Sequence, residues 1–278
     1  MTVNEAKQKL IKGLETVSES ALFEANEIII AALKIKRGDL IFCGKNQITC
    51  AQQRRINKLL ARRKKGIPLQ YLLGEWEFYG LPFKVGKGVL IPRSDTELLV
   101  DLALEEANHN EKLEVFDLCS GSGAIGIAVQ KNLQGANVTL VEKSKKAFKY
   151  LVQNIKLNGS AVTPVRANVF SWQPTAKADI VVCNPPYITK SEMKTLQKEV
   201  KKEPNLALFG GNDGLKYYRF LTQNAGRFLK KGGKLLVEIG AEQGEDVLNL
   251  FKENGFENTQ IFKDINQIGR VVLGTYNK

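Results

Sequence analysis

Four consecutive residues, Asn184-Pro185-Pro186-Tyr187, place hydrogen-bond acceptors and an aromatic ring directly after an apolar run, 179–183. The run predicts a buried strand, so we expect the tetrapeptide where a parallel sheet opens into a crevice. Neither proline has a backbone N–H, which leaves carbonyl acceptors and few donors. With the Asn184 oxygen and the Tyr187 ring, the stretch predicts a stiff pocket for a planar NH2 group. Two prolines after a strand are equally typical of a rigid turn, so this motif alone decides nothing.

A glycine-rich stretch, Ser120-Gly121-Ser122-Gly123-Ala124-Ile125-Gly126, follows a second apolar strand candidate. Its glycines allow a tight turn close to a ligand, and Glu142, which ends the next predicted strand, can accept hydrogen bonds from ribose hydroxyls. The spacing also matches a dinucleotide fingerprint. Against a nicotinamide enzyme, more than a hundred residues precede the motif, and Asp117 stands at the strand end. A carboxylate there suits a cationic ligand, such as S-adenosylmethionine, better than a pyrophosphate.

Together the two motifs resemble those of the class I methyltransferases that methylate conjugated amino nitrogens. Four further stretches are similar to the peptide chain release factor glutamine N5-methyltransferases, the HemK/PrmC family: 68–74, 89–97, 203–215 with Tyr218-Arg219, and 236–240. The similarity is dense from about Pro68 to the last residue and thin before it. It implies methyl transfer from S-adenosylmethionine to the side-chain amide nitrogen of the glutamine in a release factor's Gly-Gly-Gln motif.

The expected site residues follow from motif position. The Asn184 side-chain oxygen and the Pro185 carbonyl are expected to accept from the substrate amide, while Tyr187, with Pro186, packs on its plane. The expected cofactor-binding residues are Asp117, Cys119, Ser120, Gly121, Ser122, Gly123, Glu142, Asn168, Val169 and Asn184, and no metal site is expected. The chain departs from the family's common pattern at Cys119-Ser120, where Gly-Thr is frequent, and at Glu142 and Asn168, where Asp is usual.

Two other classes of function stay open at this point. An exocyclic amine of adenine or guanine has the same planar geometry, so a nucleic-acid amino methyltransferase is the chief alternative. Such an enzyme usually carries a recognition domain larger than the helical segment before Pro68, and the stretch 203–219 resembles the protein-methylating family instead. An adenosine-binding module without enzymatic activity is the third possibility.

Composition limits the setting in which the protein works. The formal charge is +12, and residues 1–75 hold 14 basic against 7 acidic side chains. This surplus suggests an acidic partner, although a solvated lysine-rich surface explains it as well. The four cysteines lack metal-ligand spacing, and we find no signal peptide or membrane span, so a cytoplasmic protein is expected. His109, the only histidine, is expected in a loop, so the mechanism is expected to work without histidine.

The hydrophobic pattern predicts two domains and a linker. Helical spacing from Val3 to Lys65 predicts a small all-helical domain at 1–73, expected to dock the substrate, in which Ser18 or Ser20 caps the second helix. Residues 74–93 are expected to form a hairpin linker that turns at Gly80. From 94 to 278 strands and helices alternate, which predicts an α/β domain with a parallel sheet covered on both faces. The family resemblance implies that this domain is of the class I methyltransferase type, with a Rossmann-like, seven-stranded sheet. Strands are expected near 113–118, 138–142, 162–166, 179–183, 234–239, 258–263 and 270–274, with the last two antiparallel.

Overall fold

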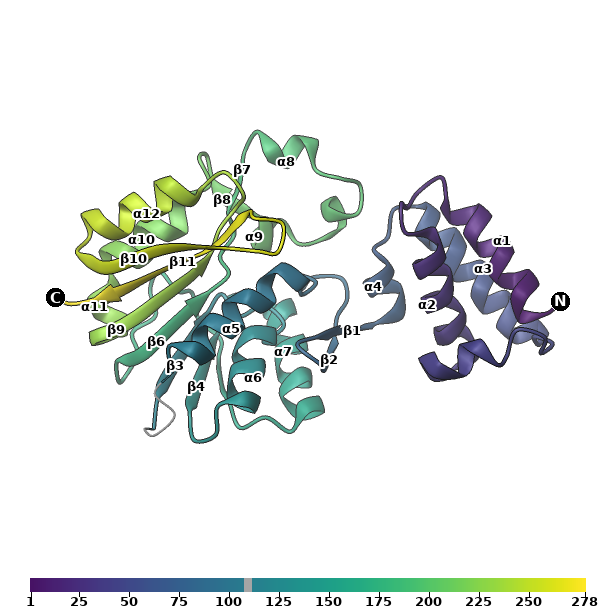
Figure 1. The fold of residues 1–278 in the computed structure, drawn as a ribbon, viewed down its shortest axis with the longest axis horizontal. Helices are drawn as coiled ribbons and strands as arrows, with labels where there is room; N and C mark the ends of the chain where they lie inside the picture. The colour runs from purple at the N-terminus through teal and green to yellow at the C-terminus, as the bar shows by residue number, and fades with distance from the viewer. Residues whose placement is uncertain (108–111) are drawn as a thin grey trace. The chain divides into compact units, whose positions relative to one another are not determined.

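The computed structural model describes residues 1–107 and 112–278, so His109 lies outside the described residues. The chain forms two compact units (Figure 1). The helical unit consists of Met1–Gly74 together with Gln197–Lys202, and the α/β unit consists of Glu75–Leu196 together with Glu203–Lys278. Within the described parts of the chain, no helix combines the length and apolar character needed to span a bilayer.

The helical unit contains α1 (Val3–Leu14), α2 (Ala21–Leu33), α3 (Cys50–Lys64), the short α4 (Leu69–Leu73), and two 3-10 turns, η1 (Arg37–Ile41) and η3 (Val200–Lys202). Capping boxes start α1 and α3, where Thr2 pairs with Glu5 and Thr49 pairs with Gln52. Ser20 occupies the N-cap of α2, but its side chain makes no capping hydrogen bond. The apolar pattern thus predicted the helices correctly, and Ser20 stands at a predicted N-cap position without a capping hydrogen bond from its side chain.

The α/β unit begins with the predicted hairpin, in which β1 (Glu75–Phe78) pairs antiparallel with β2 (Leu81–Lys84). Tyr79 and Gly80 form the turn, and both have positive φ, as expected for a two-residue hairpin loop. The main sheet has seven strands in the order β10-β11-β9-β6-β3-β4-β5. Its bounds are β3 (Glu114–Leu118), β4 (Asn137–Val141), β5 (Thr163–Val165), β6 (Ala178–Cys183), β9 (Leu229–Glu238), β10 (Phe256–Lys263) and β11 (Gly269–Tyr276).

Pairing in the sheet follows the prediction. The five strands from β9 to β5 are parallel, whereas β11 pairs antiparallel with both β9 and β10. The Rossmann-like, seven-stranded fold expected from the sequence is therefore confirmed. All carboxyl ends of the parallel strands meet at one edge, which is where such sheets bind ligands.

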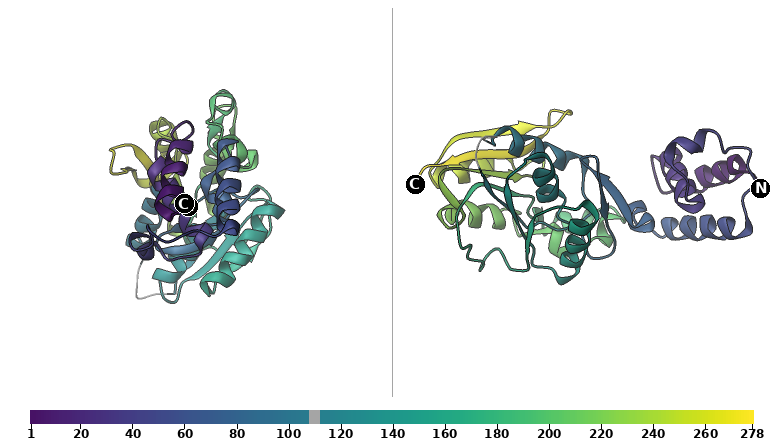
Figure 2. Two further views of the ribbon diagram at one scale, coloured as in Figure 1. Left: turned by 90° about the vertical axis from the view of Figure 1, so that its right-hand side faces the viewer. Right: turned by 90° about the horizontal axis from the view of Figure 1, so that it is seen from below.

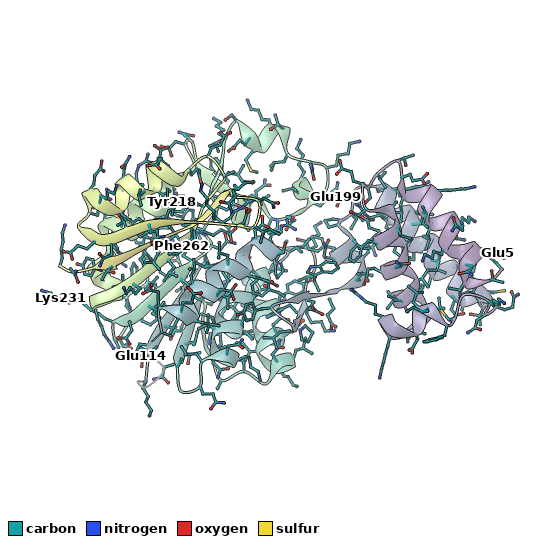
Figure 3. The ribbon with its side chains drawn as sticks, viewed as in Figure 1. Glu5, Glu114, Glu199, Tyr218, Lys231 and Phe262 are labelled. Carbon is teal, nitrogen blue, oxygen red and sulfur yellow. The ribbon has the colours of Figure 1, made fainter. Side chains whose placement is uncertain are left out.

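Helices cover both faces of this sheet (Figures 1 and 2). On one face α5 (Glu97–Glu105), α6 (Ala124–Asn132) and α7 (Lys145–Asn158) share a core with Val115 and Val182. On the other, α10 (Lys216–Gln223), α11 (Ala225–Phe228) and α12 (Gly244–Glu253) share a core with Phe116 and Val181. Adjacent strand residues thus belong to opposite cores, because side chains alternate along a strand. Tyr218 of α10, labelled in Figure 3, is fully buried in the second core.

Between β6 and α10 the chain forms a small structure that the sequence pattern did not predict. The short β7 (Ile188–Thr189) pairs in parallel with β8 (Phe209–Gly211), outside the main sheet. The short helices α8 (Glu192–Thr195) and α9 (Asn205–Leu208) lie in the same stretch. Far upstream of it in the sequence, the 3-10 turn η2 (Ser94–Thr96) leads into α5. This structure holds the residues that follow the Asn-Pro-Pro-Tyr motif.

Candidate active site

The turn between β3 and α6 forms the floor of the candidate site. Cys119 leaves β3 with a φ of 64°, in the left-handed region where glycine is favoured. A Cβ on Gly126 would lie 2.0 Å from Leu140 and 3.0 Å from the Asp117 carboxylate. Gly126 is therefore required for close packing of α6 on the sheet, and not for contact with a phosphate.

Two carboxylates flank this turn. The Gly126 N–H donates to Asp117 Oδ2 at 3.0 Å, while Asp117 Oδ1 is buried and has no hydrogen-bond partner among the described residues. Burial raises the pKa of Asp117 to about 8. Glu142, which follows β4, accepts from the Gly121 N–H at 2.9 Å, and burial raises its pKa too, although backbone N–H groups oppose the shift. Both groups would gain from a cationic or hydroxyl-bearing ligand.

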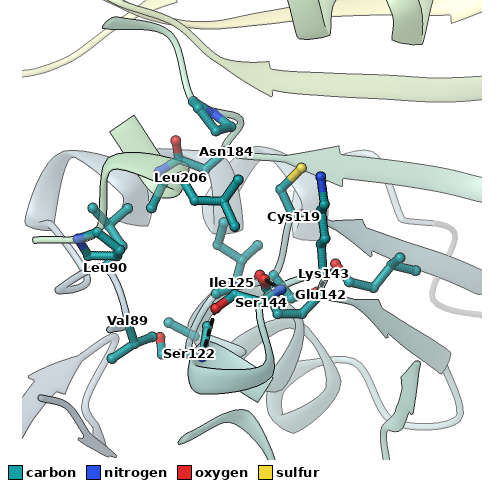
Figure 4. A pocket seen from close by; sticks show the side chains of 18 of the residues that line it. Val89, Leu90, Cys119, Ser122, Ile125, Glu142, Lys143, Ser144, Asn184 and Leu206 are labelled. Atoms are coloured by element: carbon teal, nitrogen blue, oxygen red, sulfur yellow. Dashed lines mark hydrogen bonds between the residues drawn. The ribbon is translucent and has the colours of Figure 1, made fainter. Parts of the chain in front are cut away.

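One pocket at the carboxyl edge of the sheet brings the two predicted motifs together (Figure 4). Asn184 and Leu206 stand on one side of it, and Cys119, Ser122 and Glu142 stand on another. Nine of the predicted site residues line this pocket, namely Cys119, Ser120, Gly121, Ser122, Glu142, Asn168, Val169, Asn184 and Pro186. The glycine turn and the Asn-Pro-Pro-Tyr stretch 184–187, which we call the acceptor motif, therefore contribute to a single pocket.

Four of the predicted site residues do not line the pocket wall. Asp117 lies fully buried beneath the turn, and Gly123 is the N-cap of α6. Pro185 is buried, and Tyr187 packs partly buried against the second core, near the backbone of Gly240. Burial raises the pKa of the Tyr187 phenol, with the Glu238 carboxylate adding to the effect, so this hydroxyl stays protonated. Direct contact between these four residues and a ligand therefore stays a prediction.

The stretch 203–215 supports the acceptor motif from outside the sheet. A Cβ on Gly210 would lie 2.6 Å from the carbonyl oxygen of Pro186 and 2.6 Å from the Cα of Tyr187. Buried Glu203 accepts a hydrogen bond from the Ile91 N–H at 3.0 Å and forms an ion pair with Arg93. The family-like stretches 89–97 and 203–215 are thus joined to each other and to the acceptor motif.

Several pocket residues were not singled out as site residues by sequence reasoning. Thr96 and Tyr217 line the pocket, and so do apolar and backbone groups of Leu90, Ile91 and Leu206. The available signal was the family-like character of 89–97 and 203–215, but nothing in those stretches shows that they fold against Asn184. The β7–β8 pairing and the contacts of Glu203 with Ile91 and Arg93 are what bring these two stretches close to Asn184.

The seven-stranded, Rossmann-like sheet is of the class I methyltransferase type, and residues 94–206 match the Methyltransferase small domain family. Residues 5–74 match the PrmC N-terminal domain. A methyltransferase from Pyrococcus furiosus shares the fold, with a TM-score of 0.55 and 15% identity over 83% of this chain and 100% of that one.

Two relatives identify the family more narrowly. The release factor glutamine methyltransferase of Fusobacterium nucleatum is 40% identical over 91% of this chain and 72% of its own length. That of Geobacter sulfurreducens is 40% identical over 92% of this chain and 90% of its own. The chain belongs to the release factor glutamine methyltransferase family, as the sequence motifs predicted.

Proposed function

We propose that this protein transfers a methyl group from S-adenosylmethionine to the side-chain amide nitrogen of the glutamine in the Gly-Gly-Gln motif of peptide chain release factors. The observation that carries the proposal is that Asn184 and Pro186 line the same pocket as the glycine turn and Glu142. The helical unit, which matches the PrmC N-terminal domain, is the proposed docking module for the release factor.

The chemical difficulty lies in the nucleophile. A glutamine amide nitrogen is planar and barely basic, because its lone pair is delocalised into the carbonyl. We assign the Asn184 side-chain oxygen and the Pro185 carbonyl as acceptors for its two N–H groups, which would orient the amide and oppose the positive charge that grows on nitrogen. The Tyr187 ring and Pro186 would hold its plane. Alignment of this kind contributes several orders of magnitude in rate.

The residues of the pocket fit the proposed cofactor. When bound, S-adenosylmethionine supplies a methyl group on a positively charged sulfur, already activated for displacement. The buried Asp117 Oδ1, which has no hydrogen-bond partner among the described residues, is an acceptor for its ammonium group. Glu142 suits the ribose hydroxyls, with Cys119, Ser120, Gly121, Ser122 and Gly123 around the methionine and ribose, and Asn168 and Val169 at the adenine.

The test incubates the protein with labelled S-adenosylmethionine and either purified release factor or total RNA and DNA. Mass spectrometry should find the mass of one added CH2 group on the glutamine of the Gly-Gly-Gln peptide. Asn184→Ala should lower turnover by about 10²-fold or more, the cost of one preorganised polar group, while cofactor binding measured by calorimetry stays close to wild type. Asn137→Ala, at the exposed amino end of β4, is the matched control and should behave as wild type.

The alternatives give different outcomes in the same experiment. Label in nucleic acid and none in the release factor would identify a base amino methyltransferase. Saturable binding of S-adenosylmethionine without transfer to any of these substrates would identify a binding module. Normal turnover by Asn184→Ala would refute the assigned acceptor.

A further inference from the structure

The amide of Asn184 has two chemically different ends, and only its oxygen can accept from a substrate N–H. The end that is available depends on what the other end binds. Asn184 Nδ2 donates to Thr96 Oγ1 at 3.2 Å. Thr96 is 4% exposed and ends η2, so its hydroxyl is held in place by the protein.

Behind this pair lies a carboxylate that the proposed mechanism does not use. Glu238 is the last residue of β9 and is 4% exposed. Thr96 and Asn184 face its side chain closely enough to lower its pKa, and its Oε2 is buried without a hydrogen-bond partner among the described residues. An ionised carboxylate only accepts hydrogen bonds, so either neighbour can bind it only as a donor.

We propose that Glu238, acting with Thr96, is a positioning residue that fixes which end of the Asn184 amide is available to the substrate. In this arrangement one N–H of Asn184 binds Thr96, as the structure shows, the other is directed to Glu238, and Oδ1 is left as the free acceptor. Thr96 accepts from Asn184, and under this proposal it directs its own O–H to Glu238, so the direction of every bond follows from the charge of the carboxylate. The inference rests on the proposed function, because it concerns the acceptor assigned there.

Protonation of Glu238 would remove this constraint, because a carboxylic acid can donate to Asn184 Oδ1. Burial raises the pKa of Glu238 to about 7. The titratable and charged groups that face it come from several elements: Arg270 of β11, which lowers this pKa, Asp95 of η2, which raises it, and Cys183, Tyr187 and Tyr218. Arg270 is itself paired with Asp95 at 2.9 Å and with Asp264 at 2.8 Å.

The test compares pairs of variants that differ in hydrogen bonding but little in shape. Glu238→Gln places an N–H donor beside Asn184 Oδ1, and Thr96→Val removes the hydroxyl, whereas Thr96→Ser retains it. We expect kcat for release factor methylation to fall at least about 10-fold in Glu238→Gln and in Thr96→Val, towards the loss expected for a missing oriented acceptor. The KM for release factor and the Kd for S-adenosylmethionine should change less than about 2-fold, and Thr96→Ser should recover most of the turnover.

The pH dependence gives a readout that a merely structural role would not change. In wild type, kcat should rise with pH through about 7, as Glu238 loses its proton, and this limb should be absent in Glu238→Gln. Thermal melting of each variant shows whether it is folded. If Thr96→Val turns over like Thr96→Ser, or if Glu238→Gln keeps the acid limb, the positioning role is refuted while the proposed function stands. If folded wild type methylates no release factor, the proposed function itself fails.

Discussion

Cys119 occupies a backbone conformation that residues with a side chain rarely adopt. Its φ of 64° costs a non-glycine residue roughly 1–2 kcal/mol. It stands at the position where the resembled family often has glycine, and the structure gives the physical reason for that preference. The residue lines the pocket, so the strain is located at the site itself.

We therefore expect Cys119→Gly to raise the free energy of unfolding by up to about 1 kcal/mol, because relief of strain exceeds the added entropy of the unfolded chain. Urea denaturation measures this difference. Cys50→Gly, the same change in the first turn of α3, should instead destabilise by about 0.5 kcal/mol. Equal losses in the two variants would show that Cys119 stores no strain.

Asp117 predicts a linkage between pH and stability. Its pKa in the folded protein is about 8, against an ordinary value of 3.8, so the folded state binds a proton that the unfolded state has released between these values. Stability should therefore decline as pH rises from about 4 to 8. In Asp117→Asn this contribution is lost, and the melting temperature should depend less steeply on pH.

The same variant tests the proposed cofactor contact. Asp117→Asn should weaken binding of S-adenosylmethionine about 10-fold or more, the usual cost of losing a charge-assisted hydrogen bond. Asp246→Asn, on the exposed start of α12, is the control and should leave both binding and the pH profile unchanged. Unchanged affinity in Asp117→Asn would place the ammonium group elsewhere.

At the scale of elements, the pairing of β7 with β8 brings the backbone at Gly210 into close contact with the backbone of the acceptor motif. Gly210 approaches Pro186 and Tyr187 so closely that a methyl group would meet backbone atoms, which cannot rotate away. The stretch 203–215 therefore acts as a support for the acceptor motif.

Gly210→Ala should displace the acceptor motif and lower kcat by about 10²-fold, the usual effect of a misplacement near 1 Å in an aligned site. Gly38→Ala provides the matched control, because no heavy atom lies within 4 Å of the Cβ that it would add. Release factor methylation under saturating cofactor measures both. Wild-type turnover in Gly210→Ala would mean that the motif tolerates the shift.

At the scale of the whole molecule, one compact unit is built from two distant stretches of chain. Gln197–Lys202, which lies between β7 and β8 in sequence, belongs to the helical unit. Within that unit, Arg63 is 2% exposed and pairs with Glu24 at 2.7 Å and with Glu199 at 2.5 Å. Three basic residues stand in the last turn of α3, where cations stabilise the helix dipole, but Arg63 among them is buried and joins α2 to the stretch 197–202.

Arg63→Ala should destabilise the helical unit by about 3 kcal/mol, because it leaves buried Glu24 without its partner. It should also release the stretch 197–202, so that trypsin cuts there faster than in wild type. The neighbouring Arg62 is exposed, and Arg62→Ala should alter stability by less than about 0.5 kcal/mol. Equal protease resistance in the two variants would contradict the connecting role of Arg63.

Local patterns in the sequence were sufficient for the fold class, the hairpin, the seven strands and the two motifs. Alternation along strands, spacing along helices and turn chemistry act over a few residues, so they can be recognised without a structure. Local patterns did not predict which apolar residues of α2 are buried, because Leu22 is 56% exposed although it shares the helical spacing of its buried neighbours. Which part of an apolar stripe is covered depends on the packing partner.

By itself, then, the sequence determined the strands of the main sheet, the hairpin and the residue types at the strand ends, but not the small β7–β8 structure. Only the tertiary structure decided that Thr96 and Glu238 meet at Asn184, that Gly210 abuts Pro186, and that Arg63 pairs with Glu199. Gly210 and Pro186 are 24 positions apart in the sequence, and the other residues joined here are 54 to 142 positions apart. No local pattern encodes such proximity. At Asn184 it arises because the sheet and its crossovers bring separate strand ends to one edge, and at Arg63 because a distant stretch of chain packs into the helical unit.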